Sequence, residues 1–199
     1  MKNEEVFLYS IINQFKIQKM KKFILLFATI LFVACQQPSD SIASVQVDDD
    51  KTQAIQKMFE NYMAYGTDSY DPDYDQSIIS NDLQGNNSIP GFEVNKDSFL
   101  ETDSQHHALF DNISMWMPGS EDGTGGGLHT NYYDEFGTWT HYWGTWTGTG
   151  KFTGNQVTQF IHLNYGWNDE GKIIYHNIHI DGKDFLTELN AAQAASGSE

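Results

Sequence analysis

The chain has 199 residues and a formal charge of −16 at pH 7, from 11 lysines, no arginine and 27 acidic residues. This composition argues against nucleic-acid binding, because neutralisation of phosphates by basic side chains supplies most of that affinity and the forked guanidinium is missing altogether. Aromatic residues make up 14% of the chain, too many for a disordered protein. The length suits one domain with extensions.

The N-terminal segment has the features of an export signal. A basic stretch precedes Phe23–Ala34, an uninterrupted apolar and small-residue run, and Cys35 follows directly. The run is too short to cross about 30 Å of hydrocarbon comfortably at about 1.5 Å per residue. We therefore expect a signal peptide at residues 1–34. Met20 opens such a signal by itself, so residues 1–19 are expected to be an over-extended start.

The residues that precede the cysteine resemble the lipobox of bacterial lipoproteins. They are Leu31, Phe32, Val33 and Ala34, with Phe32 where leucine is usual. The resemblance implies that Cys35 is diacylated and becomes the mature N-terminus. It also implies a location in the bacterial cell envelope, lipid-anchored and with the outer membrane as the expected site. A plain signal peptide with a chance cysteine, or a membrane anchor, remains the alternative; Cys35 has no disulfide partner in its own chain.

The segment after the cysteine is polar and predicts a flexible tether at residues 35–50. Asp50 then offers a helix N-cap, with Gln53 three residues on as in a capping box. Apolar side chains follow at the spacing of an amphipathic helix that packs on a core. They are Ile55, Met58, Phe59, Tyr62 and Met63. The folded domain is predicted at residues 51–195, with a tail at residues 196–199.

An acidic segment, Tyr65–Pro90, separates this helix from the next. Some of its residues fall at the spacing of a calcium loop, with Gln76 where that loop has glycine. They are Asp71, Asp73, Asp75, Ser77 and Asp82. An ordinary solvated acidic loop is the favoured interpretation, and calcium binding by residues 71–82 is the alternative.

A second helix is predicted at Lys96–Leu109, with Asn95 as its cap. His106 and His107 fall seven residues after two apolar positions, so they share their helix face and point toward the core or a pocket rim. A strand at Asp111–Met117 and a glycine-rich acidic loop at Pro118–Leu128 follow. The loop is expected to be mobile at the mouth of a site. His129–Phe136 then leads into a sheet.

Three consecutive antiparallel strands organise the C-terminal half. They are predicted at Thr138–Thr147, Gln156–Trp167 and Lys172–Asp181. Four of the five tryptophans and four of the seven histidines of the chain lie in these strands. Asp181 and Asp184 then stand at the start of a short closing helix.

This order of elements resembles the NTF2-like domains, and the SnoaL-like polyketide cyclase group looks most similar. The segments that carry the resemblance are Ala108–Asp111, Gly144–Gly148 and Glu170–Ile173, together with Asp181 and Leu186. Trp146 stands where that group has histidine. The resemblance covers Thr52 to Ala192 and implies an α+β cone, in which about three helices wrap a curved antiparallel sheet around a pocket. It also implies frequent dimerisation through the outer sheet face.

Successive side chains of a strand point to opposite faces of the sheet, and this alternation separates candidate site residues that face inward from those that face outward. His176 shares a face with Ile178 and Ile180, so it is expected to point inward, whereas His162 and Asn164 face outward. His141 lies between two tryptophans and enters the pocket if that face is internal. The predicted site residues are His141 and His176 as catalytic groups, with Tyr62, His106, His107, Trp139, Trp143 and Asp181 as pocket residues. The alternative is that the histidines are satisfied core residues and Asp181 only caps the helix.

No metal and no cofactor is expected, because no pair of histidines has metal-ligand spacing on one inward strand face. The favoured function is a lipid-anchored envelope module that binds a small apolar or aromatic molecule in its cone. A cofactor-independent acid/base enzyme of the cyclase, isomerase or dehydratase kind, with His141 or His176 as base, is the first alternative. A dimeric interaction module without a ligand is the second.

Overall fold

The computed structural model describes residues 43–116 and 127–197. The predicted signal peptide, the lipidation site at Cys35 and most of the predicted glycine-rich loop lie outside the described residues. None of the helices in the described part of the chain is long and apolar enough to cross a bilayer.

Strands and helices alternate in the first half of the described chain, and strands dominate the second. In chain order the elements are β1 (Ala43–Gln46), α2 (Asp50–Met63), α3 (Tyr74–Ile78), β2 (Ile79–Asn87), α4 (Lys96–Leu109), β3 (Phe110–Met115), β4 (Gly127–Tyr133), β5 (Gly137–Gly150), β6 (Gln156–Trp167), β7 (Ile173–Ile180) and α5 (Lys183–Ser196).

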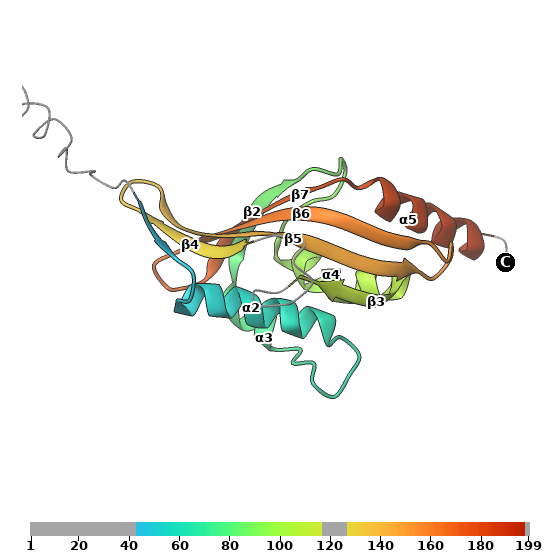
Figure 1. The fold of residues 1–199 in the computed structure, drawn as a ribbon, viewed down its shortest axis with the longest axis horizontal. Helices are drawn as coiled ribbons and strands as arrows, with labels where there is room; N and C mark the ends of the chain where they lie inside the picture. The colour runs from blue at the N-terminus through green and yellow to red at the C-terminus, as the bar shows by residue number, and fades with distance from the viewer. Residues whose placement is uncertain (1–42, 117–126, 198–199) are drawn as a thin grey trace, which may run out of the picture. The chain divides into compact units, whose positions relative to one another are not determined.

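All described strands belong to one sheet, in the order β1-β4-β5-β6-β7-β2, with β3 also paired to β5. The pairs are antiparallel except for β2, which runs parallel to β7. The end strands β1 and β2 do not pair with each other, so the curved sheet is open (Figure 1). The predicted α+β class and the C-terminal meander are confirmed, and β6 has the predicted bounds.

The helices α2 and α4 lie on one side of the long strands (Figure 1). Along α2 the apolar stripe that was predicted from the sequence is buried against the sheet, with Ile55 fully inaccessible and Phe59 against Tyr142. Burial of each such large side chain stabilises the fold by about 1.5–3 kcal/mol. The cap of α2 is Asp49 rather than the predicted Asp50, and its carboxylate accepts from the Thr52 backbone N–H at 2.8 Å.

The helix α4 has its predicted bounds and cap. Asn95 accepts from the Ser98 backbone N–H at 2.9 Å, and Ser98 Oγ accepts from the Asn95 N–H at 3.0 Å. This reciprocal pair satisfies two amides that the first turn would otherwise leave without partners. The cap thus fixes where the helix starts and which side chains face the sheet.

Two segments predicted as loops are partly regular. Within the expected tether, Ala43–Gln46 forms β1 and pairs with β4. Within the acidic segment, Asp75 lies in the short helix α3 and Asp82 in strand β2, so the residues at calcium-loop spacing do not form one loop. In the described parts of the chain, no group of three or more His, Cys, Asp or Glu side chains is placed to hold a metal ion.

Candidate functional site

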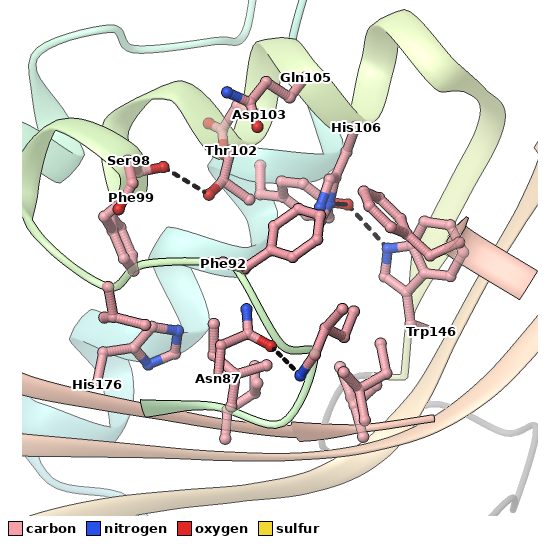
Figure 2. Close-up of a pocket in the computed structure, with 18 of the residues that line it drawn as sticks. Asn87, Phe92, Ser98, Phe99, Thr102, Asp103, Gln105, His106, Trp146 and His176 are labelled. Carbon is pink, nitrogen blue, oxygen red and sulfur yellow. Dashed lines mark hydrogen bonds between the residues drawn. The ribbon is translucent and has the colours of Figure 1, made fainter. Parts of the chain in front are cut away.

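A cavity of about 200 Å³ lies between the helix-covered face of the sheet and α2, α4 and α5. Its wall is mostly apolar and includes Phe99, Leu163 and Ile178. Figure 2 shows His176 on one side of this space and His106 with Trp146 on the other, with Phe92 between them. The strand alternation explains this wall, because every second side chain of β6 and β7 points to the same face.

A buried hydrogen-bond chain crosses one end of the cavity. Trp146 donates from its indole nitrogen to the Tyr62 hydroxyl at 2.8 Å, and that hydroxyl lies 2.8 Å from His106 Nδ1. Burial lowers the pKa of His106 to about 4, so its ring is neutral at pH 7, and burial raises the pKa of Tyr62 well above its usual value. A neutral imidazole has one acceptor nitrogen, so Nδ1 can accept a hydrogen bond from the Tyr62 hydroxyl when the ring proton is on Nε2.

His176 stands at the opposite end and is buried. Its ring stacks on Tyr165 at 4.6 Å between ring centres and meets the edge of Phe99 at 5.3 Å. Burial lowers its pKa to about 4, although a hydrogen bond with the Asn164 backbone opposes that shift. Nδ1 of this neutral ring is buried and has no hydrogen-bond partner among the described residues.

Two buried carboxyl groups, Asp75 from α3 and Asp103 from α4, also line the cavity. Burial, and to a smaller extent the charge of Asp103, raise the pKa of Asp75 to about 7. Burial raises the pKa of Asp103 to about 6, against the effect of a hydrogen bond from Tyr70. At neutral pH Asp75 is thus poised between its charged and its protonated form.

Three polar atoms in the cavity wall are buried and have no partner among the described residues. They are Asp75 Oδ1, Gln159 Nε2 and His176 Nδ1. Buried polar groups are satisfied in nearly all native proteins, and an unsatisfied one costs about 1–3 kcal/mol. The wall therefore has one amide nitrogen, one imidazole nitrogen and one titratable carboxyl whose hydrogen bonds are not made within the described chain.

Of the residues predicted for the site, Tyr62, His106 and His176 line the cavity. His107 does not: its Nε2 lies 2.9 Å from the Tyr62 carbonyl oxygen, and its ring packs on Tyr65. Asp181 is exposed outside the cavity and accepts from the Lys183 backbone N–H at 3.1 Å, near the start of α5. The N-cap of α5 is Gly182, not Asp181.

The expected convergence of His141 with His176 is not observed. Trp139, His141 and Trp143 lie on the face of β5 opposite to Tyr142 and Trp146, and none of the three lines the cavity. Tyr142 and Trp146 contact α2 through Phe59 and Tyr62. The predicted face was wrong because β5 has tryptophan on both faces, so the size of its side chains does not tell inside from outside.

Asp75, Asp103 and Gln159 are among the cavity residues that the sequence did not predict. Asp103 carried a usable signal, because it follows Phe99 by four residues and precedes His106 by three, which places all three on one helix face. Gln159 lies two residues before Ile161 in β6, so both side chains point to the buried face of that strand. Asp75 had no such signal, since it lies in an acidic segment without periodicity.

No protein-family model matches the chain, and no curated protein sequence matches it either. Several solved structures are similar in fold, including the following two. A protein described as a SnoaL-like polyketide cyclase from Jannaschia sp. CCS1 has a TM-score of 0.51 at 10% identity, over 77% of this chain and 96% of its own. PrhC from Penicillium brasilianum NBRC 6234 has a TM-score of 0.51 at 12% identity, over 75% of this chain and 92% of its own.

At such low identity the similarity establishes a shared fold and carries no activity over to this chain. The described domain has an α+β NTF2-like fold, with a curved, open and mainly antiparallel sheet whose one face is covered by helices.

Proposed function

We propose that the cavity binds one small apolar or aromatic molecule that carries a polar group. The observation that carries this proposal is the set of three unpartnered buried atoms in an otherwise apolar wall. A ligand with a hydroxyl or carbonyl group satisfies His176 Nδ1 or Gln159 Nε2, while the rest of the molecule contacts apolar side chains. Recognition of this kind is usual for small-molecule sites.

The size of the cavity limits the ligand. A dry cavity of about 150 Å³ holds benzene, and the cavity here has about 200 Å³. A single substituted ring therefore fits, whereas a fused polycyclic molecule requires the wall to move.

The test compares phenol with toluene as probes, measured by calorimetric titration of the purified protein. We expect phenol to bind more tightly than toluene, and Ile161→Trp, which fills the cavity, to abolish binding of both. Thr158→Trp is the matched control, since Thr158 is an exposed residue of the same strand. Binding that survives Ile161→Trp in a folded protein excludes the cavity as the site.

A second candidate function is acid/base catalysis, favoured by the raised pKa of Asp75 at the cavity wall. In this mechanism the Asp75 carboxylate takes a proton from the carbon beside a carbonyl group and later returns one to the same molecule. Gln159 is placed to donate a hydrogen bond to the carbonyl oxygen. His176, with its pKa near 4, supplies an acceptor rather than an acid.

Deuterium exchange of cyclohexanone in D₂O, followed by NMR, tests this second function. We expect the protein to accelerate exchange at the carbons beside the carbonyl and Asp75→Asn to abolish the acceleration. Asp68→Asn, at an exposed position, is the control. Equal exchange rates with and without the protein refute the proposal.

Export and lipid attachment also remain proposals, supported by the resemblance of Leu31–Cys35 to a lipobox. We expect a palmitate analogue to label the chain in a bacterial host and Cys35→Ser to abolish the label. An unlabelled wild-type chain refutes the attachment.

A homodimer through the outer sheet face, where Phe160 is 56% exposed, is proposed as the assembly. Sedimentation equilibrium tests it, and a monomer at every concentration overturns it.

A further inference from the structure

The outer face of the sheet carries a line of four histidines from four neighbouring strands. His129 of β4 lies directly opposite His141 of β5, and His162 of β6 lies directly opposite His179 of β7. The ring centres are 5.4 Å apart within each pair, and 6.2 Å separate His141 from His162. We call these four residues the histidine row. It lies on the face opposite to the cavity.

The ring of His141 is held by a neighbouring amide. Its Nδ1 lies 2.5 Å from Asn164 Oδ1, directly across the β5–β6 pair. An amide oxygen only accepts, so Nδ1 is the donor in this hydrogen bond and Nε2 is the ring nitrogen that the bond leaves unused. Metal-binding histidines are typically oriented in this way, by a hydrogen bond from the nitrogen that does not bind the metal.

Two of the four rings, those of His141 and His162, have an Nε2 atom without a hydrogen-bond partner among the described residues. Both of these Nε2 atoms are buried. The ring of His162 is covered by Trp143, which stacks on it at 3.4 Å between centres and 13° between planes. Asn164 also forms a side-chain hydrogen bond with His162. Two oriented imidazoles on adjacent strands thus present nitrogens that nothing else in the described chain uses.

We propose that the histidine row binds a divalent late transition-metal ion, with His129 and His141 as its ligands. Two imidazoles that share one ion have ring centres on the order of 5 Å apart, given metal–nitrogen bonds of about 2.0–2.1 Å. The observed 5.4 Å between His129 and His141 is compatible with that spacing. Imidazole suits copper, nickel and zinc, and the usual order of affinities places Cu²⁺ first.

The ligand count follows from the geometry. As placed, no three of the described His, Cys, Asp or Glu side chains can hold one ion together, so two histidines bind directly and water completes the coordination. His162 is the next nitrogen along the row and approaches the ion only after its ring turns away from Trp143.

The experiment uses the purified full chain without a histidine tag, titrated with Cu²⁺. Electron paramagnetic resonance of the bound ion shows nitrogen splitting when imidazoles coordinate it. We expect such splitting in the wild type and its loss in the double variant His129→Ala, His141→Ala, with both proteins folded by circular dichroism. Asn164→Ala keeps both ligands but frees the His141 ring, and we expect it to weaken binding about 10–100-fold.

His179→Ala is the matched control, because His179 lies in the same row but outside the proposed ligand pair. We expect it to leave the affinity and the spectrum unchanged. Nitrogen splitting that persists in the His129/His141 double variant overturns the proposal. A loss in His179→Ala equal to that in the double variant also overturns it, since binding then belongs to other residues of the face.

Discussion

The buried carboxyl of Asp75 lowers the stability of the fold at neutral pH, and Asp75→Asn should reveal by how much. The side chain is only 7% exposed, and its pKa rises from 3.8 to about 7. One pKa unit corresponds to about 1.4 kcal/mol, so ionising Asp75 in the folded protein costs up to about 4 kcal/mol. The amide has the same shape and cannot ionise.

The sign of the pH dependence follows from the direction of this shift. Because the folded pKa lies above the unfolded one, the folded state binds more protons between pH 4 and pH 7. The stability associated with Asp75 is therefore complete below about pH 4 and is lost as the pH rises through 7. His106 and His176 act in the opposite direction, since their folded pKa values are lowered to about 4 and their contribution is lost as the pH falls.

The contributions of Asp75 and of the two histidines to the pH dependence of stability have opposite signs. The informative quantity is therefore the difference in unfolding free energy between Asp75→Asn and the wild type at each pH. Urea unfolding at pH 4, 6 and 8 should show Asp75→Asn gaining stability relative to wild type as the pH rises, by up to about 4 kcal/mol. The exposed Asp68→Asn should show no such trend. A difference that stays constant from pH 4 to pH 8 refutes the assignment of a raised pKa to Asp75.

Three further substitutions test the packing around the cavity by urea unfolding. Glu188→Ala should cost about 3 kcal/mol. The fully buried carboxyl group of Glu188 accepts from the backbone N–H groups of Phe152 and Thr153, and both groups lose their partner in the variant. Glu101→Ala, at an exposed position, is the control and should cost almost nothing. Gly85→Ala should cost more than about 1 kcal/mol, because a Cβ there would lie 1.8 Å from the His176 carbonyl oxygen and would push β2 away from β7. Gly127→Ala is the control and should cost less, because its Cβ would lie no closer than 3.9 Å to any described residue other than its chain neighbours. Trp146→Phe removes the donor to Tyr62 and should cost about 1 kcal/mol, against a smaller effect for Trp143→Phe; equal losses would contradict the role of that bond.

Local rules predicted the elements whose side chains follow one clear period. The helix α4 begins at a capping residue and β6 alternates apolar and polar side chains over most of its length, so both have the predicted bounds. The strand β2 was missed because it has few apolar residues and pairs parallel with β7 at an edge of the sheet. Strand β1 was missed because its side chains are mostly exposed, so its pairing leaves no apolar pattern in the sequence.

The site was harder to predict than the fold because long-range packing decides which face of a strand is covered. His176 shares its strand face with Ile178 and Ile180 and was placed correctly on the inner face. His141 lies between Trp139 and Trp143, yet α2 covers the other face of β5, where Phe59 packs on Tyr142. Asp75 becomes a cavity residue only because a helix of five residues turns it inward, which no local pattern in the acidic segment indicates.

The strand β5 pairs on one edge with β6 along most of its length and on the other with β4 followed by β3. Most of its amide protons are therefore held between neighbours on both sides and exchange with deuterated solvent only when the whole domain opens. The edge strands β1 and β2 lack this double protection. Exchange rates should thus rise outward from β5, so that the part of the sheet nearest β5 keeps its amide protons longest.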